Sequence, residues 1–338
     1  LPITLDTLDR HGLWTSQFFS PFKPLNDALG GDRAAGQAFV AGVAEQLNFG
    51  LLPEVSTTTY RTKDVMLSTA LDHRPGVFGD QQHISQATLS ENAVVFITHP
   101  KNEPFTGVDR FPDADGYWTG SGTLPRSAQV GATSIHLYTP AYAAPPQGGS
   151  GPLDQFTYLP LTHAYFPTEH FDDSTGDGSW LFGREGDGYV ALWSWRPFDF
   201  VDPLPADIFT NGLTRPYDLR AEGGPDNVWI LEVGDGEQWG DFDTFRAAFS
   251  AAEISVTPHE TESGFGGFDV VWHSPAEGRI EFSTSGPLVV EGTEVPLRHE
   301  LRFDNPWARV PFDQPLYEIG DDQGGIVLDF DRGTRTVG

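Results

Sequence analysis

The stretch "SWLFGREGDGYVALWSWRPF", residues 179–198, decides the fold. Asp187-Gly188 predicts a turn, because both residues tolerate the left-handed backbone conformation. Apolar residues then alternate onto one face of the next strand with a period of two: Tyr189, Ala191, Trp193 and Trp195. The pattern predicts a β-hairpin, and similar patterns at residues 269–283, 286–303 and 324–338 predict more of them.

The whole composition agrees with a β-rich fold. The 338 residues include 38 glycines, 27 prolines and 13% aromatic residues, which is typical of many strands separated by turns. We expect a mainly β protein, a large antiparallel β-sandwich (supersandwich) with a short helical N-terminal segment. Its expected parts are a helical segment at 1–50, a central β-sandwich region at 51–200, and a C-terminal β-sandwich region at 201–338 with one helix.

Two helices are predicted. The first lies within residues 32–50, with Asp32 as its N-cap and Gly50 as its end. The second lies in "DFDTFRAAFSAAE", where Asp243 can cap and Phe242, Phe245 and Phe249 form an apolar stripe that we expect to pack in the core.

The charge of −28 limits the partners. Only Lys23, Lys63 and Lys101 are lysines, against 48 acidic residues, so we expect no nucleic-acid partner. No run is long and apolar enough for a membrane span, and we expect no membrane partner. The acidity suits a protein that is secreted or extracellular. Because Leu1 is not an initiator residue, we expect the chain to be a processed piece of a longer protein. The absence of cysteine removes thiolate chemistry.

Six of the ten histidines fall between residues 73 and 170, so we look for the site there. His83 follows Gln82 at the start of an alternating strand, where an imidazole can shuttle protons and an amide can bind sugar hydroxyls. In "FPDADGYWTGSGTLPR", Tyr117 and Trp118 offer faces for stacking on sugar rings, and Arg126 offers a fork for a carboxylate. The alternatives are a histidine bonded to a backbone carbonyl and an ordered surface turn.

The stretch "LTHAYFP", residues 161–167, predicts a strand that Pro167 ends. Period two places His163 and Tyr165 on one face, roughly 6.6 Å apart, and turns Ala164 and Phe166 to the core. A histidine and a tyrosine side by side can share a proton-transfer task. The alternative is a strand face whose polar groups meet solvent.

His170 and Asp172 follow this strand and, with His163, suggest a divalent metal site for zinc or calcium. Their spacing matches no metal motif, and "DDSTGDG" has Arg184 where a calcium loop has its last glutamate, so a plain turn is the competing interpretation. We expect no organic cofactor, because no phosphate loop or dinucleotide fingerprint is present. Paired carboxylates cannot be selected from 48 acids.

Longer segments carry a family resemblance. They are "STTTYRTKDVMLSTALDHRPGVFGDQQHISQATLSENAVVFITHP" (56–100), "GYWTGSGTLPR" (116–126), "HAYFPTEHFDD" (163–173), "GSWLFGREGDGYVALWSW" (178–195) and "NVWILEVGDGEQWGDFDTFRAAFSAA" (227–252). This part of the chain resembles the C-terminal β-supersandwich of heparinase II/III-like polysaccharide lyases.

The resemblance implies a function. Such lyases cleave uronic-acid glycosides by β-elimination, with tyrosine and histidine as proton-transfer groups and a histidine or a structural metal on the sandwich. The resemblance implies that His83 matches the histidine on the sandwich. It also implies that His163, Tyr165 and His170 match the residues of a second loop at the family's site. The family also has an α/α-toroid before the sandwich. Only one clear helix precedes it here, so another chain or an N-terminal portion would supply the toroid.

We therefore expect a polysaccharide lyase, with His83, His163 and Tyr165 as catalytic residues. Gln82, Tyr117, Trp118 and Arg126 are the expected substrate-binding residues. Two alternatives stay open: a glycoside hydrolase with paired carboxylates, and a non-catalytic carbohydrate-binding or assembly module.

Overall fold

The computed structural model describes residues 55–76, 83–101, 103, 117–118, 122–140, 158–202, 213–260, 266–298, 301–311 and 314–338, together with residues 8, 10–16, 20 and 23. The chain divides into two units, Leu1–Glu54 and Val55–Gly338. In the first unit, the described residues include a 3-10 turn, Leu13–Thr15. The helix predicted within 32–50 lies outside the described residues.

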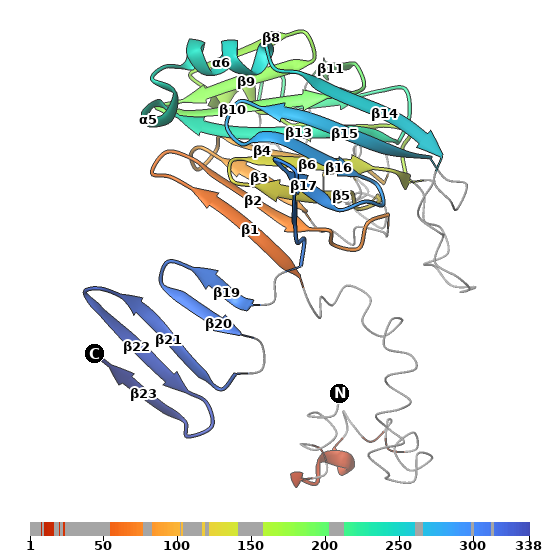
Figure 1. Ribbon diagram of the computed structural model, residues 1–338. Helices are drawn as coiled ribbons and strands as arrows, with labels where there is room; N and C mark the ends of the chain where they lie inside the picture. Colours follow the sequence, from red (N-terminus) through yellow and green to blue (C-terminus); the bar gives the residue numbers. More distant parts are fainter. Residues whose placement is uncertain are drawn as a thin grey trace. The chain divides into compact units, whose positions relative to one another are not determined.

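Antiparallel strands dominate the second unit (Figure 1), which confirms the predicted mainly β sandwich class. The first sheet has the order β1-β2-β3-β4-β7-β12-β11. Its strands are β1 Ser56–Arg61, β2 Met66–Leu71, β3 Ser85–Thr88, β4 Val94–Thr98, β7 Thr162–Tyr165, β12 Asp218–Ala221 and β11 Phe198–Val201.

The second sheet has the order β5-β6-β13-β10-β9-β8. Its strands are β5 Arg126–Val130, β6 Thr133–Tyr138, β13 Asn227–Asp235, β10 Gly188–Ser194, β9 Trp180–Glu185 and β8 Asp173–Asp177. Strands β12 and β13 lie beyond residue 201 and still belong to these two sheets, so neither sheet ends near residue 200.

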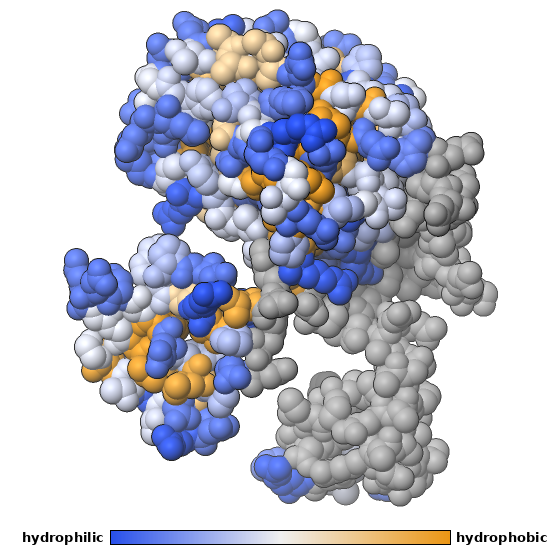
Figure 2. Space-filling model, viewed as in Figure 1, coloured by the Kyte–Doolittle hydropathy of each residue, from blue (hydrophilic) through white to orange (hydrophobic). Residues whose placement is uncertain are grey.

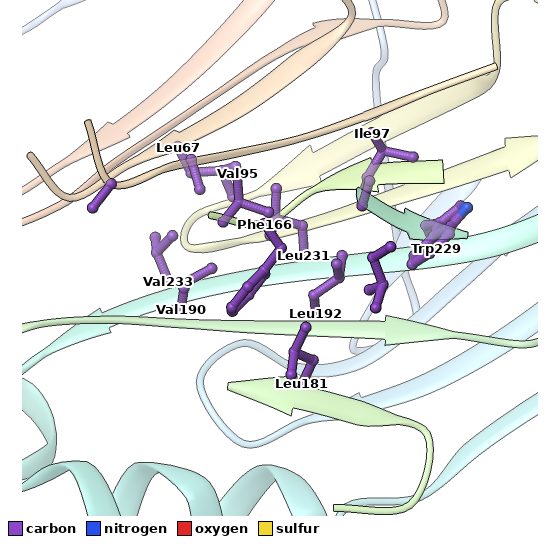
Figure 3. Packing of buried hydrophobic residues seen from close by; sticks show 14 of the residues in the cluster. Leu67, Val95, Ile97, Phe166, Leu181, Val190, Leu192, Trp229, Leu231 and Val233 are labelled. Atoms are coloured by element: carbon purple, nitrogen blue, oxygen red, sulfur yellow. The ribbon is translucent and has the colours of Figure 1, made fainter. Parts of the chain in front are cut away.

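The first two sheets pack face to face. Figure 3 shows their apolar side chains pointing toward one another, with Leu67, Val95 and Phe166 from the first sheet. Leu192, Leu231 and Val233 meet them from the second sheet. Burial of such side chains from water is the main driving force for this layer.

The other face of the second sheet carries another core. It packs against a third sheet of order β14-β15-β16-β17-β18 and against helix α6, Phe242–Ser250. The strands of the third sheet are β14 Ile254–Glu260, β15 Gly266–Ser274, β16 Gly278–Ser283, β17 Leu288–Val290 and β18 Thr293–Val295. Phe242, Phe245 and Phe249 are buried in this core, as the apolar stripe predicts. The sandwich therefore has three layers.

Two local predictions need correction. Asp241, not Asp243, caps α6, because its carboxylate accepts from the N–H of Thr244. The 180–194 hairpin turns at Gly186 and Asp187, one residue earlier than expected, with Gly186 at φ 58°. Gly188 already pairs with Glu185, and a Cβ at Gly188 would lie 2.7 Å from the carbonyl oxygen of Asp64.

The remaining elements are a short helix and a C-terminal sheet. Helix α5, Gly236–Trp239, directly follows β13. The C-terminal sheet has the order β19-β20-β21-β22-β23, with strands β19 Leu301–Asn305, β20 Ala308–Pro311, β21 Leu316–Asp321, β22 Gly324–Asp329 and β23 Thr334–Val337. Apolar side chains are exposed on it, including Trp307 and Phe330, and Figure 2 shows this apolar surface.

No helix in the described part of the chain is both long enough and apolar enough to cross a bilayer.

Candidate functional site

Strand β7 sets the site on the outer face of the first sheet, the face turned away from the second sheet. Ala164 and Phe166 point into the core between the sheets, so His163 and Tyr165 lie on the outer face, as period two predicts. Tyr165 is half-buried. His163 has a relative exposure of 0%, so the interpretation as a solvent-facing polar residue is wrong for it.

The two neighbouring strands complete two rows of side chains. Phe96 on β4 and Asp218 on β12 pair with Tyr165 in the first row. The second row places Thr98 on β4 and Arg220 on β12 on either side of His163. Sequence reasoning missed these four residues, because their partners lie 50 or more residues away along the chain.

His163 is the centre of a buried polar network. Its Nδ1 lies 3.1 Å from Oδ1 of Asp218. Its Nε2 lies 2.9 Å from the carbonyl oxygen of Tyr117 and 2.6 Å from Oγ1 of Thr98. Both ring nitrogens therefore lie within hydrogen-bond distance of an acceptor oxygen.

The carboxylate of Asp218 is surrounded by donors. The hydroxyl of Tyr117 donates to Oδ2 over 2.5 Å, and Nε of Arg220 donates to the same oxygen over 3.2 Å. Burial alone would raise the pKa of Asp218, but the hydrogen bonds and charges of its partners, His163 first, hold it below the ordinary value. Asp218 is therefore the counter-charge of this network.

Tyr117 and Trp118 cover the network as a two-residue unit. The indole of Trp118 stacks on the ring of His163 with centroids 4.3 Å apart, and the ring of Tyr117 meets His163 edge-on at 4.4 Å. The guanidinium of Arg220 lies 5.2 Å from the centre of the Tyr117 ring. These two aromatic residues, expected to bind sugar, lie beside the catalytic candidates.

His83 joins the site through the same unit. Its Nε2 lies 2.8 Å from the carbonyl oxygen of Trp118, and its ring packs on Phe96 at 4.5 Å. Because a carbonyl only accepts, Nε2 carries the hydrogen and neutral His83 keeps a lone pair on Nδ1. Desolvation lowers the pKa of His83, with a smaller lowering effect from His163, so the neutral form is favoured. The carbonyl bond expected as an alternative is present, and it fixes the tautomer.

Tyr165 lies across Phe96 from His83. The rings of Tyr165 and Phe96 stack at 5.1 Å, and β4 lies between β3 and β7 in the sheet. The ring of Trp118 meets that of Tyr165 edge-on at 5.6 Å. Among the residues that the structure describes, none accepts a hydrogen bond from the buried Nε1–H of Trp118. The site therefore holds a spare donor.

Arg126 lies in a different environment. Its Nε donates to Asp72 over 3.0 Å, and its NH1 donates to the carbonyl oxygens of Ser283 and Gly286. Its guanidinium also lies over the ring of Phe282 at 4.8 Å. None of these partners belongs to the network of His163. Gln82 lies outside the described residues.

The proposed metal residues also lie in a local setting of their own. His170 ends a 3-10 turn, Thr168–His170. Strand β8 begins at Asp173, so the interpretation of "DDSTGDG" as a plain turn is wrong. Oδ2 of Asp172 accepts from the backbone N–H of Gly186 and lies 3.4 Å from NH1 of Arg184. Within the described ranges, no three potential ligands form a metal cluster.

Comparisons with protein-family models, with curated proteins and with solved structures find no match to this chain.

Proposed function

We propose that this chain is the β-sandwich part of a polysaccharide lyase that acts on uronic-acid glycosides. The observation that carries the proposal is the pairing of His83 and Tyr165 on one partly exposed face, with Phe96 between them. The imidazole of His83 offers a lone pair on Nδ1, and the hydroxyl of Tyr165 offers a proton. The expected zinc or calcium ion and the toroid from another chain or N-terminal portion play no part in this argument.

The chemistry needs one base and one acid. Nδ1 of His83 takes the proton from C5 of the uronate, and the C4–O bond breaks as the C4–C5 double bond forms. The hydroxyl of Tyr165 then protonates the leaving oxygen. The lowered pKa of His83 keeps it neutral, as a base must be, at neutral pH.

A carboxylate-binding group supports the same assignment. Arg220 lies one row away from Tyr165, and its NH2 lies 3.6 Å from the exposed Glu103. A uronate carboxylate can replace Glu103 there. Arg126, the residue expected for this task, already has its protein partners.

The same face offers sugar-binding groups further along the sheet. Ser68 pairs with Gln86, and its hydroxyl lies 2.8 Å from that of Thr59. These residues alternate with Leu67, Ala87 and Tyr60, which pack toward the core. Hydroxyl and amide groups next to aromatic rings also suit a non-catalytic carbohydrate-binding module, which is the second candidate.

A hydrolase has less support. Asp218 is the acid nearest to Tyr165 in the register, and both of its oxygens are occupied by hydrogen bonds. A general acid or a nucleophile needs a carboxyl group that reaches the substrate.

The proposal is tested with uronate polysaccharides incubated with the full chain. Ultraviolet absorbance of the unsaturated uronide, without new reducing ends beyond one per cleavage, is the expected result. Reducing ends without that absorbance would indicate hydrolysis, and retention on the polysaccharide without either signal would indicate a binding module.

A further inference from the structure

The dipeptide Tyr117–Trp118 is bound by two histidines at consecutive carbonyls. His163 donates to the carbonyl of Tyr117, and His83 donates to the carbonyl of Trp118. His163 lies on β7, whereas His83 lies just before β3, 80 residues earlier in the chain. The two carbonyls belong to adjacent planar peptide units, so only the two backbone dihedral angles of Trp118 lie between them.

Asp218 fixes the dipeptide from the buried side. It holds His163 through Oδ1 and the hydroxyl of Tyr117 through Oδ2. Its side chain is 9% exposed and that of His163 is 0% exposed, so water does not compete with these bonds. Neither group reaches the outer surface where a polysaccharide would lie.

We propose that Asp218, acting through His163 and Tyr117, is a positioning residue that presents the Trp118 carbonyl to His83 and so holds His83 as the Nε2–H tautomer. His163 is then part of this support and does not exchange protons with a substrate. The proposal rests on the proposed function for its catalytic meaning. The arrangement of His83 itself stands on the hydrogen bonds alone.

Several charged or titratable groups lie next to Asp218 and His163. Arg220 donates to Asp218 from the same strand, and Glu103 pairs with Arg220. Thr98 contacts His163 from β4. His99, next along β4, is bonded to Thr123 and to the carbonyl of Leu159, and burial lowers its pKa to about 4, so it stays neutral.

The test is nuclear magnetic resonance of the ¹⁵N-histidine-labelled protein, with the His83 signals assigned by their loss in His83→Gln. In the unmodified protein we expect one tautomer, with hydrogen on Nε2, and a titration midpoint below the ordinary value of about 6.5. Asp218→Asn keeps the shape of the side chain and removes its charge. We expect it to give mixed His83 tautomers and to move the midpoint further down, because the bond to the Trp118 carbonyl raises the pKa of His83.

Two further variants keep the result decisive. Asp199→Asn removes an exposed acid from neighbouring β11 and should leave the His83 signals unchanged. If Asp218→Asn does not fold, Tyr117→Phe removes only the hydroxyl bond to Asp218 and should shift the His83 signals in the same direction, by less. Folded Asp218→Asn, or folded Tyr117→Phe in its place, with unchanged His83 signals overturns the proposal.

Activity provides the second measurement. If the lyase assay is positive, Asp218→Asn should lower kcat/KM at least about tenfold and shift the acidic limb of its pH profile with the His83 midpoint. If no lyase activity exists, the proposed function fails, whereas the spectra still decide whether Asp218 positions His83.

Discussion

Trp272 on β15 donates its indole N–H to Oε1 of Glu232 on β13 over 2.8 Å, which joins the second and third sheets inside their shared core. The hydroxyl of Thr133 donates to the same oxygen, and Oε2 has no partner among the described residues. Burial raises the pKa of Glu232 to about 8, because its charged form is poorly solvated there. The residue is an acid that folding keeps protonated.

We predict that Glu232→Gln removes a pH dependence of stability. The folded pKa of about 8 exceeds the unfolded value of 4.5, so the stability linked to this group is greatest below pH 4.5. It is lost as the pH rises through about 8. The amide cannot ionise, so the variant should be more stable than the parent at pH 8.5, by on the order of a few kcal/mol, and similar to it at pH 5.

Urea unfolding at several pH values between 5 and 9 measures this difference. Glu294→Gln, on the exposed part of β18, is the matched control and should not change the slope of stability against pH. An equal gain from Glu232→Gln at all pH values would contradict a protonated Glu232.

Arg126 provides a second prediction, because its guanidinium joins β5 to the loop after β16. Arg126→Gln loses the bond to the carbonyl of Gly286 and the contact with Phe282, and should destabilise the fold by about 2 kcal/mol. Affinity for a uronate polysaccharide should stay unchanged. Thermal unfolding and polysaccharide binding, both measured on Arg126→Gln and the parent, test this prediction. Weaker binding at unchanged stability would indicate that Arg126 contacts the substrate.

These residues show what the sequence could predict. The period-two pattern placed His163 and Tyr165 on one face and Ala164 in the core, because strand geometry alone sets that alternation. The burial of His163 depends on Trp118, which covers it from a loop 45 residues earlier. Pattern reasoning on one strand has no access to such a cover. Asp218 carried no signal among 48 acids, because only the register selects it.

Tyr165→Phe tests the acid of the proposed reaction. The change removes only the hydroxyl and keeps the ring that stacks on Phe96, so the fold should persist. We expect kcat to fall by about 100-fold or more, with KM little changed, because protonation of the leaving oxygen occurs in the transition state. Steady-state absorbance assays give both constants. Activity equal to that of the parent would exclude Tyr165 from the mechanism.

His83 predicts the acidic limit of the reaction. Since its pKa is lowered, mainly by burial, the base stays available at pH values where an ordinary histidine is already protonated. The acidic limb of the pH profile of kcat/KM should therefore have its midpoint below about pH 6.5. His83→Gln should abolish turnover while the dichroism spectrum stays that of the parent. A limb at or above that value would point to another base.

The net charge of −28 predicts an unusual salt dependence. A polyuronate is repelled by the field of the whole chain, and added salt screens that field as the Debye length falls from about 30 Å at 0.01 M to about 8 Å at 0.15 M. We expect kcat/KM on a long polyuronate to rise several-fold over this range. Initial rates at a series of sodium chloride concentrations, at fixed pH, measure the effect.

An oligosaccharide series is the control for this effect. A tetrasaccharide carries few charges and should show a smaller rise with salt than the polymer, because the repulsion scales with the charge that approaches the protein. If the rate on the polymer falls with salt instead, attraction to a cationic group at the site governs the encounter. Arg220→Gln would then remove that fall, since the register of β12 and β7 places Arg220 opposite His163, one row away from Tyr165.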